Sequence, residues 1–203
     1  MERISEPRVA VIGGVNMDIG GSPFAKLVMR DSNPGVITAR PGGVGRNIAH
    51  DLRLLGMDVS LVAAVGGDVY GQGILESCRE LGIDMSLARI LPERRSSTYL
   101  YVTDETGDMQ IGIADMEITE CITPEYLESR MEEINRFDAV VLDANLSAES
   151  VEYAARHCAA PIIADPVSTA KAARLVPVLD RLWAIKPNIY EAEKLTGEHD
   201  PEK

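Results

Sequence analysis

Two apolar runs near the start of the chain, Val9–Val15 and Val59–Val65, constrain the fold more than any other feature. Neither shows the alternation of a half-exposed strand, so each predicts a strand that is buried on both faces, as in a parallel sheet. A helix is predicted after each run, over Arg46–Leu55 with Gly56 as its stop, and over 68–81 with Asp68 as its cap. Strands that alternate with helices indicate an α/β fold with a mostly parallel sheet and flanking helices.

The same alternation returns in the second half of the chain. The predicted elements are a helix from Thr123-Pro124, a strand over Ala139–Leu142, a helix over Ser147–His157, a strand over Pro161–Ala164, a helix over Ser168–Leu179 that Pro177 kinks or ends early, a strand over Leu182–Lys186 and a helix over Asn188–Leu195 before Gly197. The series stops at Lys203 in what reads as its middle. We therefore expect residues 1–203 to form part of one domain that is truncated at its C-terminus.

Between these halves the strand–helix rhythm is interrupted. Ser97–Thr103 and Met109–Ala114 are short β-type runs around Asp104-Glu105-Thr106-Gly107, which is a hairpin signal. Both faces of this hairpin carry apolar or aromatic side chains, with Tyr99 and Tyr101 on the same face. We expect a small β lid, made of segments 16–40 and 96–118, that covers a ligand and contacts a second subunit in a homodimer.

Composition excludes several classes of protein. The net charge is −12, from 20 Lys and Arg against 32 Asp and Glu, which argues against a nucleic-acid partner. Three scattered cysteines fit a reducing compartment better than a disulfide framework, so a cytoplasmic location is expected. No apolar run approaches the length needed to span a bilayer, so no membrane association is expected.

The run Pro41-Gly42-Gly43-Val44-Gly45-Arg46-Asn47 places a glycine-rich backbone just before a predicted helix. Bare backbone N–H groups can approach a ligand closely there. Asn47 then offers both a donor and an acceptor to a sugar hydroxyl. The alternative is a tight turn with a helix cap. A dinucleotide fingerprint would need a third glycine that this run lacks, which weakens an NAD-dependent oxidoreductase as a reading.

Further polar residues follow the predicted strands. Asn16 and Asp18 come after the first strand, where a carboxylate can accept two sugar hydroxyls, although both residue types are also common in turns. Asp143 and Asn145 end one later strand, and Asp165 ends the next. Each is compatible with a cap or a turn, but their shared position at the carboxyl edge predicts that they line one cleft.

Asn188 and Glu191 are spaced as a capping box. The same spacing is compatible with a site for phosphate and a hydrated metal ion, because a helix N-terminus attracts anions. Glu191 could hold a water on Mg²⁺, with Lys186 close by in sequence.

Taken together, these motifs resemble the PfkB, or ribokinase-like, family of carbohydrate and nucleoside kinases. The resemblance covers nearly the whole chain and rests on Asn16-Met17-Asp18, on the segment from Gly42 to Gly56, on Gly66–Gly71 and on the Asn188/Glu191 pair. It implies ATP as co-substrate and Mg²⁺ as cofactor. It also implies that Asp18 and Asn47 hold sugar hydroxyls over a floor of Gly42 and Gly43, and that Asp165, Lys186, Asn188 and Glu191 serve the nucleotide and metal.

Three more segments look like the branch of this family that phosphorylates the 5′-hydroxyl of pseudouridine. They are Asp31–Gly35, Asp115-Met116 and Asp165–Ser168. Pseudouridine carries one more ring N–H than uridine, and a fixed acceptor at Asn33 or Asp115 could select it. Asp31 is also expected to bind the substrate. Ribose, adenosine or a ketose phosphate remain alternative substrates, and a non-catalytic nucleoside-binding or dimerisation module remains an alternative function.

One departure from the family pattern is large. Members carry a Gly-Ala-Gly-Asp type motif whose Asp is the catalytic base, and no such sequence occurs in these 203 residues. The resemblance therefore assigns no catalytic residue to this chain. Phosphoryl transfer depends on positioning and charge stabilisation, so we expect the chain alone to bind nucleoside without measurable turnover.

Overall fold

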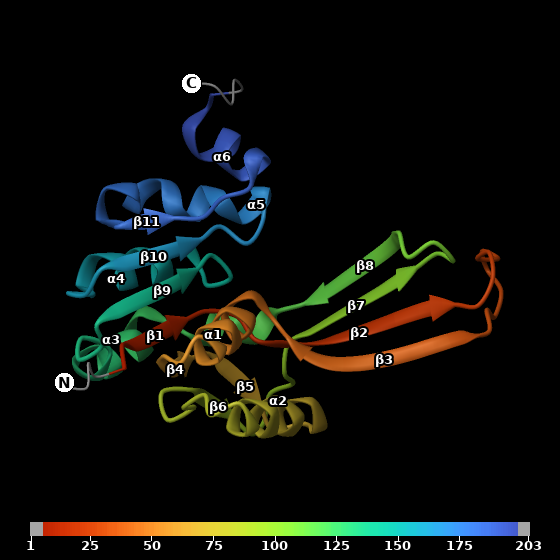
Figure 1. The fold of residues 1–203 in the computed structure, drawn as a ribbon, viewed down its shortest axis with the longest axis horizontal. Helices are drawn as coiled ribbons and strands as arrows, with labels where there is room; N and C mark the ends of the chain where they lie inside the picture. Colours follow the sequence, from red (N-terminus) through yellow and green to blue (C-terminus); the bar gives the residue numbers. More distant parts are fainter. Residues whose placement is uncertain (1–5, 199–203) are drawn as a thin grey trace.

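The chain folds into an α/β core from which a second sheet projects (Figure 1). The computed structural model describes residues 6–198. Within that range the core sheet has five parallel strands in the order β11-β10-β9-β1-β4. Their bounds are β1 Arg8–Ile12, β4 Asp58–Val62, β9 Ala139–Asp143, β10 Ile162–Asp165 and β11 Ala184–Ile185.

Helices cover both faces of the core sheet, as the apolar runs predicted. Alternate residues of β1 point to opposite sides: Val9 and Val11 pack with α1 and α2, whereas Ala10 and Ile12 pack with the helices on the other face. All four are buried, so the strand reads as a continuous apolar run. The helices are α1 Val44–Leu54 and α2 Val69–Glu80 on one side, and α3 Pro124–Ile134, α4 Ala148–His157 and the 3₁₀ helix η2 Ala173–Arg181 on the other.

Four strands form the sheet that extends away from the core, which we call the projecting sheet. They are β2 Asn16–Pro23, β3 Gly35–Gly42, β7 Thr98–Thr103 and β8 Met109–Asp115, in the order β3-β2-β7-β8. The predicted hairpin is confirmed as the antiparallel pair of β7 and β8. Tyr99 and Tyr101 share a face, with ring centroids 6.0 Å apart. The remaining elements are β5 Ala64–Gly66, β6 Arg89–Leu91, η1 Glu117–Cys121, α5 Thr169–Ala172 and α6 Ile189–Thr196.

Three predicted elements differ from the structure. Val59–Val65 is not one strand, because the chain leaves the core sheet after Val62 and pairs with β6 as β5. The helix predicted over Ser168–Leu179 is α-helical only to Ala172 and continues as a 3₁₀ helix that contains Pro177. Proline cannot donate the backbone hydrogen bond of an α-helix. The strand predicted over Leu182–Lys186 shortens to the two residues of β11.

Helix ends follow the local signals in the sequence. Gly56 and Gly197 adopt positive φ angles just beyond α1 and α6, and the Thr123 and Ser147 side chains cap α3 and α4. Asp68 caps α2 by accepting from the Gly71 N–H at 2.8 Å. The ends of these helices are therefore set by residues within one turn of each end.

We predict that Asp68→Ala lowers the free energy of unfolding by about 1–2 kcal/mol at pH 7, the usual worth of a helix cap. The carboxylate also accepts from the Ser96 N–H at 2.9 Å and the Ser96 hydroxyl at 2.7 Å. Burial alone would raise the pKa of Asp68, but these hydrogen bonds outweigh it and lower the pKa below 3.8.

The contribution of Asp68 is therefore present above about pH 4 and is lost as the pH falls through the lowered pKa. Urea unfolding of both proteins between pH 3 and pH 7 measures the difference. A difference in unfolding free energy between wild type and Asp68→Ala that stays constant over this pH range would contradict the role given to the Asp68 carboxylate.

Candidate functional site

The glycine loop lies where the projecting sheet meets the core. β3 ends at Gly42 and α1 begins at Val44, with Gly43 between them at φ 95°. A Cβ on Gly42 would lie 2.0 Å from Oδ2 of Asp18, and a Cβ on Gly43 would lie 2.6 Å from the Gly14 carbonyl oxygen. Both positions therefore require glycine, and the Asp18 carboxylate lies directly against the loop.

Asp18 is held in place by Asn16. The Asn16 side chain, 4% exposed, donates through Nδ2 to Oδ1 of Asp18 at 2.6 Å. Both residues belong to β2, in register with Gly42 and Arg40 of β3. Both follow the first core strand, as expected, but β1 stops at Ile12 and the chain enters the projecting sheet at Asn16.

Asn47 lies in the first turn of α1, on the helix side of the same loop. Its backbone N–H donates to the Gly43 carbonyl oxygen at 2.9 Å, and its side chain is exposed. Arg46 donates to Oδ1 of Asn47 at 3.3 Å and to Ser77 Oγ of α2 at 2.8 Å. The structure thus places Asn16, Asp18, Gly42, Gly43 and Asn47 around one loop, at the base of the projecting sheet.

A buried carboxyl group joins this loop to the carboxyl edge of the core sheet. Asp143, at the end of β9, is 0% exposed and accepts from the Gly14 N–H at 2.9 Å. It also accepts from the backbone N–H of Asn145 at 2.8 Å and from its Nδ2 at 3.0 Å. Burial raises the pKa of Asp143, these hydrogen bonds oppose the rise, and nearby Asp165 adds to it.

Asp165 ends the neighbouring strand in register with Asp143. Its Oδ1 accepts from the Val167 N–H at 2.8 Å, and its Oδ2 lies 3.5 Å from Nζ of the exposed Lys186. Val167 has a φ of 67°, a region that β-branched residues rarely occupy. The two aspartates lie side by side at the carboxyl edge, which confirms that these strand ends converge.

Asn188 and Glu191 form the capping box at the start of α6. The Glu191 N–H donates to Oδ1 of Asn188 at 2.9 Å, and the Asn188 N–H donates to Oε2 of Glu191 at 2.9 Å. Glu191 is 5% exposed. Within residues 6–198 no three His, Cys, Asp or Glu side chains form a metal-binding cluster. Carboxylate oxygens are nevertheless the donors that Mg²⁺ prefers, and it usually keeps several waters.

The three residues proposed to recognise a base do not meet within one chain. Asn33 lies in the loop at the far end of the projecting sheet, where its amide pairs with the backbone of Val28 at 2.8 and 2.9 Å. Asp31 is in the same loop, with Oδ1 accepting from the Ser32 N–H. Asp115 lies at the base of the sheet, 3.3 Å from the Arg95 guanidinium.

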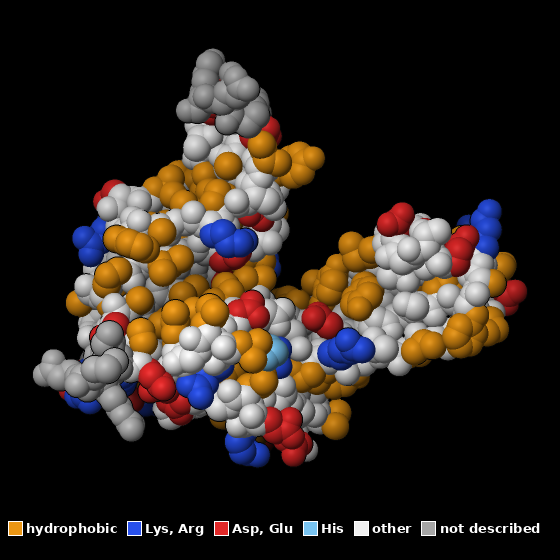
Figure 2. All heavy atoms as spheres, viewed as in Figure 1, with side chains coloured by type: hydrophobic (Ala, Val, Ile, Leu, Met, Phe, Trp, Pro, Cys, Tyr) orange, Lys and Arg blue, Asp and Glu red, His pale blue; other side chains and the backbone are white. Residues whose placement is uncertain are grey.

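The molecular surface is hollowed between the core and the projecting sheet (Figure 2). Sequence reasoning did not single out two cations at this side of the core, Lys171 and Arg174. Lys171 Nζ donates to Oδ1 of Asn145 at 2.6 Å, and Arg174 donates to the carbonyl oxygens of Ala144, Asn145 and Leu146. Their positions depend on contacts across 26 or more residues, for which the local pattern gave no signal.

Comparison with known proteins gives a consistent picture. The family model described as "pfkB family carbohydrate kinase" matches residues 6–203. A pseudouridine kinase of Escherichia coli (strain K12) is 41% identical over 190 residues, which are 93% of this chain and 61% of that protein. The chain spans between 48% and 61% of the lengths of the first three curated relatives that it matches.

Solved structures have the same fold. A carbohydrate kinase from Agrobacterium tumefaciens superposes with a TM-score of 0.88 at 31% identity, over 96% of this chain and 64% of that one. A ribokinase from Arabidopsis thaliana, complexed with ribose and ATP, gives 0.77 at 20% identity, over 95% and 63% of the two chains. The predicted fold class, a ribokinase-like α/β fold with a mostly parallel sheet, is confirmed. No helix within the described residues has the length and apolar character to cross a bilayer.

We predict that Asp143→Asn lowers the free energy of unfolding by about 1–3 kcal/mol, because the new amide directs donors at the N–H groups that the carboxyl group now satisfies. The native state keeps the Asp143 proton to a higher pH than the unfolded state does. Wild-type stability from this group therefore falls as the pH rises above about 4.

The deficit of Asp143→Asn should be largest near pH 4 and shrink toward pH 8, as measured by urea unfolding. The matched control is Asp51→Asn, on the exposed face of α1, which should change stability by less than about 0.5 kcal/mol. An Asp143→Asn protein as stable as the control at every pH would refute the role of this carboxyl group.

Proposed function

This chain belongs to the pfkB family of carbohydrate kinases, and from that premise we propose that it forms the substrate-binding part of a pseudouridine kinase. The enzyme transfers phosphate from ATP to the ribose 5′-hydroxyl and yields pseudouridine 5′-phosphate. The 41% identity to a pseudouridine kinase supports this substrate. The observation that carries the proposal is the Asp18 carboxylate, held against Gly42 at the base of the projecting sheet.

In this proposal Asp18 and Asn47 hold the ribose hydroxyls. A carboxylate accepts two hydroxyl hydrogens at once, and an amide both donates and accepts, so the pair suits a vicinal diol. Asn16 fixes the Asp18 carboxylate through its 2.6 Å hydrogen bond. Gly42 and Gly43 form the floor of the ribose site, where any larger side chain would collide with Asp18 or with the backbone.

The projecting sheet acts as a lid and as a dimer contact. Several of its apolar side chains are exposed, including Val36, Ile37, Leu100, Met109, Ile111 and Ile113. Exposed apolar patches of this kind mark interaction surfaces, and Figure 2 shows such side chains on this sheet. Asn33 and Asp115 lie at opposite ends of it, so both can approach one nucleoside only if two subunits contribute them. A homodimer through the lid would supply that arrangement.

The nucleotide and Mg²⁺ lie at the carboxyl edge in this proposal, near α6. Asp165 and Glu191 supply carboxylate oxygens for a hydrated Mg²⁺, and Asn188 presents the amino end of a helix toward phosphate. Lys186, whose side chain is 83% exposed and whose Nζ lies 3.5 Å from Asp165, would turn toward the phosphates. Mg²⁺ would neutralise charge on the transferred group. A cytoplasmic enzyme is proposed on the basis of the three unpaired cysteines.

The test is an ATP-coupled assay of the complete enzyme that contains this chain, with pseudouridine, uridine, ribose, adenosine and fructose phosphate as substrates. We expect the highest kcat/KM for pseudouridine. Asp18→Asn should lower kcat/KM by about tenfold to a hundredfold, because a hydrogen bond to a charged group is worth about 1.5–3 kcal/mol. Asp180→Asn, an exposed residue of η2 on the other face of the core sheet, serves as the control and should match wild type.

A preference for ribose or adenosine over pseudouridine would reject the substrate but keep the family chemistry. Activity that survives Asp18→Asn unchanged would reject the ribose site itself. Tight nucleoside binding without any transfer by the complete enzyme would favour a non-catalytic binding module.

A further inference from the structure

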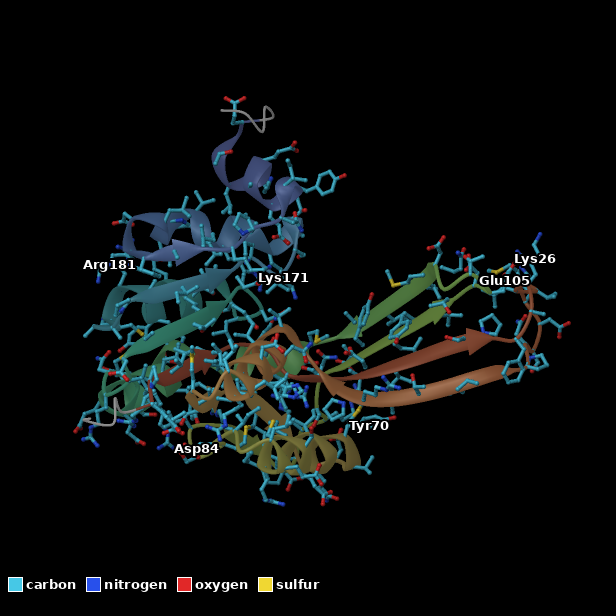
Figure 3. The ribbon with its side chains drawn as sticks, in the orientation of Figure 1. Lys26, Tyr70, Asp84, Glu105, Lys171 and Arg181 are labelled. Atoms are coloured by element: carbon cyan, nitrogen blue, oxygen red, sulfur yellow. The ribbon has the colours of Figure 1, made fainter. Side chains whose placement is uncertain are left out.

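A lysine side chain in the hollow between the core and the projecting sheet has no role in the site described above. Lys171, on α5, lies at the side of the core that faces this sheet (Figure 3). Its Nζ donates to Oδ1 of Asn145 at 2.6 Å, and the structure gives it no second hydrogen-bond partner among the described residues. An ammonium group has three donors. Two N–H groups therefore remain for a ligand.

Lys171 is connected to the glycine loop by a short series of contacts. Asn145, which accepts from Lys171, donates to the buried Asp143 carboxyl group at 3.0 Å. The Asn145 side chain also packs so closely on Gly14 that a Cβ there would lie 2.8 Å from its Nδ2. The carbonyl oxygen of Gly14 in turn lies against Gly43. Asn145 and Gly14 thus lie between Lys171 and the glycine loop, on the core side.

The backbone before α5 is held in an uncommon conformation that positions this lysine. Val167 has a φ of 67°, and its N–H donates to Asp165 at 2.8 Å. Ser168 then caps α5 by accepting from the Lys171 N–H at 3.4 Å. Strained positions of this kind cost about 1–3 kcal/mol and persist where the surrounding structure enforces them. The strained turn directs α5, and with it the lysine, back toward the end of β9.

The cavity beside Lys171 favours a neutral acceptor over an anion. It has a volume of ≈ 250 Å³, and Met116, Glu117, Glu120, Asn145 and Ser147 line it together with Lys171. Two of these residues are carboxylates, which repel a phosphate group. Arg174, the other cation at the cavity, directs its Nη1 group at three backbone carbonyl oxygens. Burial, with a further contribution from Arg174, lowers the pKa of Lys171.

A neutral carbonyl oxygen can accept a hydrogen bond from this ammonium group without the repulsion that Glu117 and Glu120 exert on an anion. The carbonyl oxygens of a pyrimidine base are such acceptors, and a sugar without a base lacks them. Met116 directly follows Asp115, the last residue of β8, so the cavity reaches from the core to the base of the projecting sheet. The glycine loop lies at this same end of the sheet, because Asp115 pairs with Thr98, Thr98 with Met17, and Asn16 with Gly42.

We propose that Lys171 is a specificity-determining residue that donates a hydrogen bond to a carbonyl oxygen of the nucleobase. Asn145 holds the ammonium group in position for this contact. The inference rests on the proposed function, because it requires that ribose binds at the glycine loop. It adds a residue that distinguishes a nucleoside from a free sugar, which Asp18 and Asn47 cannot do by contacting the ribose alone.

The test is isothermal titration calorimetry of the 203-residue chain with pseudouridine and, separately, with ribose. Lys171→Met keeps the length of the side chain and removes the ammonium group. We expect its affinity for pseudouridine to fall by about tenfold to a hundredfold, the worth of one hydrogen bond to a charged group. Its affinity for ribose should stay within about twofold of wild type. Lys194→Met, an exposed lysine on α6, is the matched control.

A second variant separates loss of the hydrogen bond from loss of the fold. Lys171→Arg keeps a cation with several donors and should retain part of the preference for pseudouridine over ribose, with a thermal midpoint close to that of wild type. Equal losses of both ligands in folded Lys171→Met would show that the lysine only supports Asn145, and would overturn the proposal.

Two further results would also overturn the inference, and they separate it from the proposed function. If wild type binds neither ligand, or binds ribose without pseudouridine, then the proposed nucleoside function fails first. If wild type binds both, but Lys171→Met weakens binding of inorganic phosphate and leaves pseudouridine unchanged, then Lys171 serves an anion and only the inference on Lys171 fails.

Discussion

The fully buried carboxyl group of Asp143 holds together the parts on which the site depends. It receives hydrogen bonds from Gly14, just after β1, and from Asn145, just after β9. The absence of side chains at Gly13 and Gly45 leaves room for it, since a Cβ at either position would come within 3.1 Å of its carboxylate. A single polar group in an apolar core must be satisfied fully to be tolerated. That requirement fixes the ends of two core strands and the start of α1 relative to one another.

This arrangement determines the geometry of the glycine loop. The helix α1 is anchored against β1 and β9. Gly42 and Gly43 therefore lie between Asp18 and the backbone of Gly14, in a space too narrow for a Cβ atom. The projecting sheet then grows outward from the loop, because β2 and β3 pair in register from Asn16 and Gly42. The core thus places polar side chains at the base of a sheet that has an exposed apolar surface. This combination suits a small hydroxylated ligand.

The sequence predicted those features that local chemistry determines. Gly56 ended α1, Asp68 capped α2 and Asn188 formed a capping box with Glu191, since each depends only on neighbours within one turn. Segment 16–40 was expected to belong to the β lid, but its strands at 16–23 and 35–42 were not delimited, because Gly20, Gly21 and Pro23 disrupt the β pattern there. The position of Lys171 was equally unpredictable. It depends on a strained turn and on a partner 26 residues away, which no short window of sequence contains.

The central claim is that Asp18 and Asn47 bind a ribosyl group across the glycine loop. Amide chemical shifts of the ¹⁵N-labelled chain, recorded as pseudouridine is added, test it most directly. If these residues bind ribose, saturable shifts are expected at Gly42, Gly43 and Asn47, with little change elsewhere in the core. Unchanged shifts at the loop would contradict it, most clearly if the residues that move line the cavity of ≈ 410 Å³ between Arg8 and Asp84 at the opposite edge of the core sheet.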